Sequence, residues 1–294
     1  MSPRLEVLHL FVRHPDDFLH DESTIFVNIS QLGYLCALEC TAIVLDPIAM
    51  RLLATLPQLE SLKITSVSLW TSGYREYSTH LNDLVLPDGS FRKLKHLALQ
   101  LLSYTTIARV WTFPQLVRGL RSVELGFTEF FTGWGNDVIR DVCAASPDIE
   151  ELTLDFGDVD PEFHNYEIFN VYLENLQLRS LRRLRIRDGT AVYRSHESFI
   201  PLLLDYWNNM EYLDISTFPL HLEDLVLFAA YLPKLRLLSI PLDLRNWRTI
   251  LDPESITPSP VSVCLKGRFD VTEPYRSVDE QTPELMEELD VAAR

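Results

Sequence analysis

One short pattern of apolar and variable positions recurs along this chain. An apolar residue is followed by two variable positions, a second apolar residue, one variable position and a third apolar residue. Nine copies are present: Leu5-Leu8-Leu10, Leu35-Leu38-Cys40, Leu59-Leu62-Ile64, Leu94-Leu97-Leu99, Leu120-Val123-Leu125, Ile149-Leu152-Leu154, Leu181-Leu184-Ile186, Met210-Leu213-Ile215 and Leu235-Leu238-Ile240. Successive copies are separated by about 29 residues. The chain is therefore built from repeats of one structural unit.

Each repeat is expected to contain a strand and a helix. The last two apolar residues of a triplet are two positions apart, so in a strand they point to the same side, into a core. Between triplets, apolar residues follow helical spacing. The helix after Asp46 is expected over Ile48–Leu56, with Asp46 as N-cap and Pro47 in its first turn. Further helices are expected at about Asn136–Ala145, Tyr166–Leu176, Ser198–Trp207 and Leu222–Leu232.

The repeat length predicts an α/β leucine-rich-repeat solenoid. Strands stacked side by side at ~4.8 Å form a parallel sheet, and bulkier helices on the other side force it to curve. We expect a curved horseshoe over residues 1–268, with parallel strands on the concave face and helices on the convex face. A last strand, Val261-Val263-Leu265, is expected to cap its C-terminal end, and residues 269–294 are expected to form an acidic, flexible tail.

The first repeat has no preceding unit to cover it. Leu5, Leu8 and Leu10 would lie at an open end with an unpaired strand edge. We expect either that the chain is a piece of a longer product or that a partner subunit or a dimer contact covers this end.

Composition and charge exclude several classes of partner. The 294 residues include 26 Lys and Arg against 42 Asp and Glu, a net charge of -16, which repels nucleic-acid phosphates and anionic lipids. The longest apolar run, Leu225–Leu232, is far short of the ~20 residues that span a membrane. The first ten residues contain no uninterrupted apolar stretch with a basic flank, so no signal peptide is expected. We expect no nucleic-acid or membrane partner, and a cytoplasmic or nuclear location.

Catalytic, cofactor and metal motifs are not found. The four cysteines (Cys36, Cys40, Cys143, Cys264) are too scattered for a disulfide framework or a zinc site and are expected to be reduced and mostly buried. The chain has no HExxH, GxSxG, P-loop or GxGxxG sequence. We therefore expect a protein that is not an enzyme and that uses no cofactor.

The concave strand face is the expected binding surface for a partner protein. Arg183, Arg185 and Arg187 form a basic strand between an acidic strand, with Glu151 and Asp155, and a strand that carries Tyr212 and Asp214. The other concave-face candidates are Lys63 and His96. Arginine recognises carboxylate and phosphate groups, so an acidic or phosphorylated segment would fit there. The alternative is that these charges pair with one another across the strands.

A set of aromatic residues follows the strands. They are Trp70, Tyr74, Trp111, Phe127, Phe130, Phe131 and Trp134. Aromatic side chains are enriched at binding hot spots, but they also fill cores. Core packing is expected for most of them.

Four motifs share one form and point to a family. They are Leu59-Glu60-Ser61-Leu62, Leu94-Lys95-His96-Leu97, Leu181-Arg182-Arg183-Leu184 and Met210-Glu211-Tyr212-Leu213. With the irregular repeat length and the acidic, aromatic-rich loops, they resemble the repeat region of fungal F-box/leucine-rich-repeat proteins over about residues 3–243. In that family an N-terminal F-box domain docks the adaptor of a cullin ubiquitin ligase, and the repeats select a substrate.

Two features depart from related repeat classes. No F-box-like stretch is found in the chain, and no asparagine ladder follows the strands. The resemblance implies a non-enzymatic scaffold that forms the substrate-recognition region of an F-box-type ligase subunit, with the cullin adaptor bound through an F-box outside this sequence. The alternative is a structural or regulatory repeat scaffold unrelated to ubiquitination.

Overall fold

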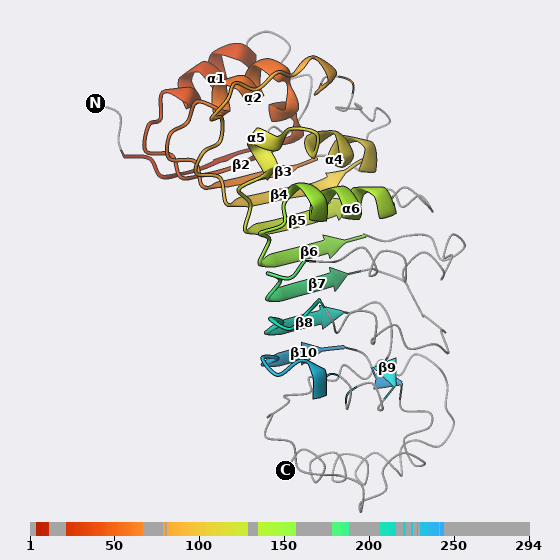
Figure 1. Ribbon diagram of the computed structural model, residues 1–294. Coiled ribbons are helices and arrows are strands. Elements are labelled where there is room, and N and C mark those ends of the chain that lie inside the picture. Colours follow the sequence, from red (N-terminus) through yellow and green to blue (C-terminus); the bar gives the residue numbers. More distant parts are fainter. Residues whose placement is uncertain are drawn as a thin grey trace, which may run out of the picture.

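Nine parallel strands form one sheet in the order of the sequence (Figure 1). The computed structural model describes residues 4–11, 22–66, 79, 81–128, 135–156, 178–187, 206–215, 220–221, 225, 228, 230–240 and 242–243. The strands of the sheet are β1 (Val7–Leu10), β2 (Ala37–Thr41), β3 (Ser61–Thr65), β4 (His96–Leu102), β5 (Ser122–Phe127), β6 (Glu151–Asp155), β7 (Arg183–Arg187), β8 (Tyr212–Ile215) and β10 (Leu237–Ser239). A separate two-stranded pair joins β9 (Leu220–His221) to β11 (Leu242–Asp243).

The nine apolar triplets predicted from the sequence coincide with these nine strands. In each triplet the first residue lies just before the strand, and the last two point into the core. At β5, for example, Leu120 just before the strand and Val123 and Leu125 within it are all buried. Strand pairing places triplet opposite triplet, as in Leu38 opposite Leu62. The prediction of stacked parallel strands is confirmed, and the α/β fold is solenoid-like in its sequential strand order.

The helices of the described part lie on one side of the sheet (Figure 1). They are α1 (Glu22–Ser30), the 3-10 helix η2 (Ala42–Leu45), α2 (Pro47–Leu53), the 3-10 helix η3 (Leu81–Asp83), α4 (Tyr104–Val110), α5 (Pro114–Val117) and α6 (Gly135–Ala145). Helix α6 confirms the prediction for Asn136–Ala145. Helix α2 begins where expected but ends at Leu53, three residues before the predicted Leu56. Helices α1, α4 and α5 were not predicted.

Capping residues explain where two of these helices begin. Asp46 Oδ1 accepts hydrogen bonds from the backbone N–H of Ile48 at 2.8 Å and of Ala49 at 3.3 Å, and Pro47 occupies the first position of α2. Ser103 Oγ accepts from the N–H of Thr106 at 3.3 Å at the start of α4. Each side chain satisfies N–H groups that the first helical turn leaves free.

One irregularity interrupts the regular pairing, between β4 and β5. The register shifts between Leu99 and Leu102, and Leu101 has a φ of 56°, in the left-handed region that a residue with a Cβ rarely adopts. Opposite this bulge lies Gly126. A Cβ at position 126 would lie 3.3 Å from both Gln100 Cα and Leu101 N. Glycine therefore allows the bulged backbone to approach closely.

The substitution Gly126→Ala tests this close approach. We expect it to lower the free energy of unfolding by about 1 kcal/mol, because backbone atoms of the bulge must move to admit the methyl group. Urea denaturation measures the change. Gly33→Ala is the control, since a Cβ there would meet no atom within 4 Å. An equal effect of the two substitutions would contradict the packing explanation.

Several sequence predictions concern residues outside the described part. These are the helix at 166–176, most of the helix at 198–207, the strand at 261–265 and the tail at 269–294. Of the helix expected at 222–232, positions 225, 228, 230 and 231 are helical. Within the described ranges, no helix is both long enough and apolar enough to cross a membrane.

Candidate functional site

The sheet has two unlike faces. One face, covered by the helices, carries the buried triplet residues. The other, which we call the open face, carries the first, third and fifth side chains of the strands, and most of these are half-buried or exposed. Strand pairing aligns them in rows that cross the sheet. The central row is His9, Glu39, Lys63, Ala98, Glu124, Thr153, Arg185, Asp214 and Ser239.

At the β1 end of this row, Glu39 contacts its neighbours on both sides. Glu39 Oε1 lies 2.7 Å from Lys63 Nζ, and Glu39 Oε2 lies 2.7 Å from His9 Nδ1. Lys63 was predicted as a partner-binding residue, and the structure joins it to Glu39. The hydrogen bonds from Lys63 and His9 lower the pKa of Glu39 below its ordinary value.

At the β7 end, two of the three predicted arginines also form ion pairs. Arg183 Nη1 lies 3.1 Å from Glu151 Oε1. Arg185 Nε donates to Asp214 Oδ2 at 2.9 Å, and its Nη2 donates to the Tyr212 hydroxyl at 3.0 Å. The contacts with Tyr212 and then Asp214 raise the pKa of Arg185. The cross-strand pairing that the sequence left open as the alternative is therefore present for these two arginines.

Arg187 and His96 differ from the other predicted site residues. Arg187 is exposed and lies opposite Asp155 in the strand register, but among the described residues no ion pair involves Arg187. His96 is exposed in the row that joins Ser61 to Ser122, and its ring makes no hydrogen bond within the described ranges. These two side chains remain accessible on the open face, as a binding role requires.

A second charged row, missed by the sequence analysis, lies at the amino ends of the strands. Arg121 Nη1 lies 3.0 Å from Glu150. Arg182 lies 3.8 Å from Glu150 and 2.7 Å from Glu211, so it links the two carboxylates. Lys95 and Glu60 form a separate pair at 3.1 Å. Each of these residues directly follows the first apolar residue of its triplet. That fixed position, with mostly opposite charges in successive repeats, is the signal that could have found the row.

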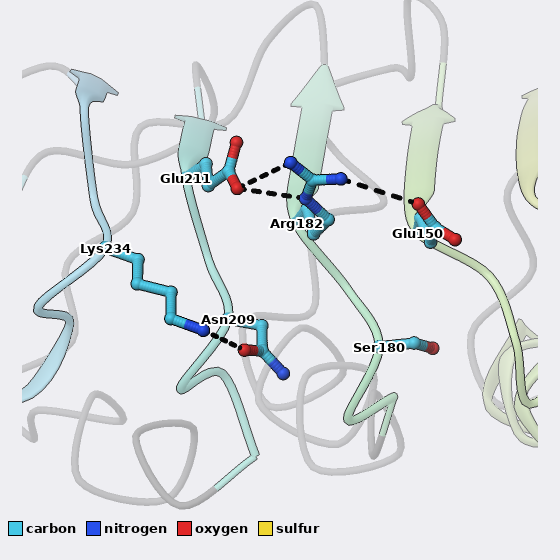
Figure 2. A pocket seen from close by; sticks show the side chains of 6 residues that line it. All are labelled: Glu150, Ser180, Arg182, Asn209, Glu211 and Lys234. Atoms are coloured by element: carbon cyan, nitrogen blue, oxygen red, sulfur yellow. Dashed lines mark hydrogen bonds and ion pairs between the residues drawn. The ribbon is translucent and has the colours of Figure 1, made fainter.

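A pocket of about 370 Å³ lies beside this row (Figure 2). Its lining residues are Glu150, Ser180, Arg182, Asn209, Glu211 and Lys234. Figure 2 shows Arg182 between the two carboxylates and Lys234 directed to Asn209, whose Oδ1 accepts from Nζ at 2.6 Å. The lining holds two acids, Glu150 and Glu211, and two bases, Arg182 and Lys234, so it presents little net charge to a ligand.

The described residues hold no group of three or more His, Cys, Asp or Glu side chains that could bind a metal ion.

Three cysteines lie in the described part and are unlinked: Cys40 is buried, while Cys36 and Cys143 are half-buried. Burial raises the pKa of the Cys40 thiol, which keeps it protonated and unreactive. Among these three described cysteines, the thiol of Cys40 is the fully buried one, as expected.

Two of the aromatic candidates belong to the core. Trp111 and Phe127 are buried, and the Phe127 ring stacks on Phe156 with centroids 5.4 Å apart. Both follow the expectation of core packing. Trp70, Tyr74, Phe130, Phe131 and Trp134 lie outside the described residues.

The paired carboxylates predict how stability depends on pH. Hydrogen bonds from Lys63, Lys95 and Arg182 lower the pKa of Glu39, Glu60 and Glu211 below 4.5. Their contribution is therefore complete above pH ~4.5 and is lost as the pH falls through the lowered values, where the unfolded chain binds more protons.

The urea midpoint measured from pH 7 down to pH 3 checks this expectation. These groups should leave the midpoint nearly unchanged between pH 7 and pH ~4.5. At lower pH, their protonation should make the midpoint fall. In Glu211→Gln the fall should be less steep, because one linked group is gone. A midpoint that rises on acidification below pH ~4.5, or an unchanged slope in Glu211→Gln, would contradict the assigned pairs.

No protein-family model matches this chain, and no curated protein matches it in sequence.

Proposed function

We propose that the chain is a leucine-rich-repeat solenoid that binds a partner protein on the open face. The observation that carries the proposal is the contrast between the two sheet faces. Aliphatic side chains fill one face, whereas all nine strands carry polar or charged side chains on the other. No helix of the described part packs on this second face (Figure 1). A wide polar face on a rigid stack of strands suits recognition of another protein's surface.

Pre-organisation supports this role. The ion pairs Glu39–Lys63, Arg183–Glu151 and Arg185–Asp214 join neighbouring strands, so the side chains of the open face are held before a partner arrives. A face ordered in advance loses less conformational entropy on binding. Within it, Arg187 and His96 are exposed and available for direct contact.

The more specific proposal is that the repeats select the substrate of an F-box-type ubiquitin ligase. It rests on the sequence resemblance of the repeats. The general proposal of a protein-binding scaffold does not depend on it.

Site-specific photo-crosslinking in the cells of origin tests the binding face. A photoreactive amino acid replaces either His96 or Arg187 on the open face. The matched control positions are Arg140 and Ala144, which are exposed on α6 on the helix side of the sheet. We expect a discrete protein adduct from the open-face positions and none from the α6 positions.

Mass spectrometry of the adducts and of the proteins that co-purify separates the alternatives. Adducts from α6 alone, or from no position, would contradict the proposed binding face. A cullin and its adaptor among the co-purifying proteins would support the ligase proposal. A stoichiometric partner without them would leave a repeat scaffold unrelated to ubiquitination.

A further inference from the structure

Glu124 is a charged side chain in a ring of small ones. It lies in the middle of β5, on the open face. Its register neighbours are Ala98 on β4 and Thr153 on β6, and its neighbours on the same face of its own strand are Ser122 and Gly126. None of the four is long enough to cover a glutamate carboxylate. The carboxylate can therefore be approached from above the sheet.

Glu124 also differs from other carboxylates of the open face because no cation neutralises it. Glu39, Glu151 and Asp214 lie 2.7, 3.1 and 2.9 Å from their basic partners. Within the part of the chain that the structure describes, Glu124 forms no ion pair. Its partner there is the neutral amide of Gln100, whose Nε2 donates to Glu124 Oε1 at 2.9 Å.

The amide holds the carboxylate in place without neutralising it. Gln100 Oε1 in turn accepts from Thr65 Oγ1 at 3.4 Å, so the contact belongs to a short network across β3, β4 and β5. Among the described residues Glu124 Oε2 has no hydrogen-bond partner. A half-buried, oriented carboxylate with one free oxygen binds a charged donor more strongly than a neutral one.

We propose that Glu124 binds a lysine or arginine side chain of the partner protein docked over β4, β5 and β6, an inference that rests on the proposed function. A basic side chain is long enough to pass between the small neighbours and reach the free oxygen. The net charge of -16 favours encounter with a basic partner surface. A divalent metal ion is a poorer fit, because Mg²⁺ and Ca²⁺ need several oxygen ligands and the described residues hold no group of three or more His, Cys, Asp or Glu side chains that could bind one.

Selection from a displayed library of short random peptides on the full chain tests the inference. Selected peptides are then measured against three variants. Glu124→Gln keeps the shape and removes the charge, Ser122→Trp blocks the open face beside it, and Ala144→Trp places the same bulk on α6. We expect the peptides to be rich in lysine or arginine and to bind Glu124→Gln and Ser122→Trp about tenfold or more weakly. Binding to Ala144→Trp should be unchanged.

The variants separate failure of the inference from failure of the proposed function. Binding weakened by Ser122→Trp but equal in Glu124→Gln would show that the face binds peptides without a basic contact at Glu124, and would overturn the inference alone. Binding that Ser122→Trp does not weaken, or a selection that retains no peptide, would count against the proposed function and the inference together. Circular dichroism of each variant establishes that its fold is intact.

Discussion

Replacing Leu125 by alanine is expected to lower the free energy of unfolding by 2–5 kcal/mol, because the substitution leaves a cavity in the middle of the sheet. Leu125 is fully buried on β5 and lies in register between Leu99 on β4 and Leu154 on β6. In a stack of repeats each unit is stabilised mainly by its neighbours, so a cavity here weakens two interfaces at once. Chemical denaturation followed by circular dichroism measures the loss.

Ser122→Ala on the same strand is the matched control. Ser122 lies on the open face, where a change of this size should alter stability by less than ~0.5 kcal/mol. Comparable losses in the two variants would contradict the assignment of one face to the core and the other to solvent.

Replacing Trp207 by alanine is expected to lower the free energy of unfolding by about 3–5 kcal/mol, because it removes a large buried aromatic side chain. Trp207 is fully buried just before β8, outside the apolar triplets, and among the described residues it is the largest of the fully buried side chains. Domains are stable by only about 5–15 kcal/mol in total, so this loss removes a large part of the free energy of unfolding and should lower the melting temperature markedly.

Thermal denaturation of Trp207→Ala and Trp207→Phe checks this expectation. Phenylalanine retains part of the aromatic volume and should restore part of the lost melting temperature. A melting temperature of Trp207→Ala equal to that of the unchanged chain would show that the tryptophan is not a core residue of the folded protein.

The strands and their register could be predicted from sequence because a single rule governs them. Two apolar residues that are two positions apart must share one strand face, and nine repeats of that rule leave little freedom in how the strands stack. Short helices follow weaker rules. Helix α5 has four residues and α4 seven, too few for a clear apolar periodicity, although Ser103 at the start of α4 is a visible cap.

The site was predicted less completely than the fold. The sequence placed Arg183, Arg185 and Arg187 on one face, but ion pairing depends on where each side chain reaches across strands. The structure pairs Arg183 and Arg185 with carboxylates on neighbouring strands, whereas no ion pair of Arg187 is found among the described residues. Glu124 was not chosen from the sequence, because its significance comes from small neighbours on two other strands and from a hydrogen bond to Gln100. Such a setting appears only once the strands are side by side.

The affinity of the partner protein identified by photo-crosslinking for the variants Ser122→Trp and Ala144→Trp tests the proposed binding face most directly. Both variants add the same indole, one on the open face and one on α6, and calorimetry with the purified partner measures each. We predict that Ser122→Trp weakens binding by about tenfold or more while Ala144→Trp leaves it unchanged. Equal affinities of the two variants, or a loss confined to Ala144→Trp, would show that the open face is not where the partner binds.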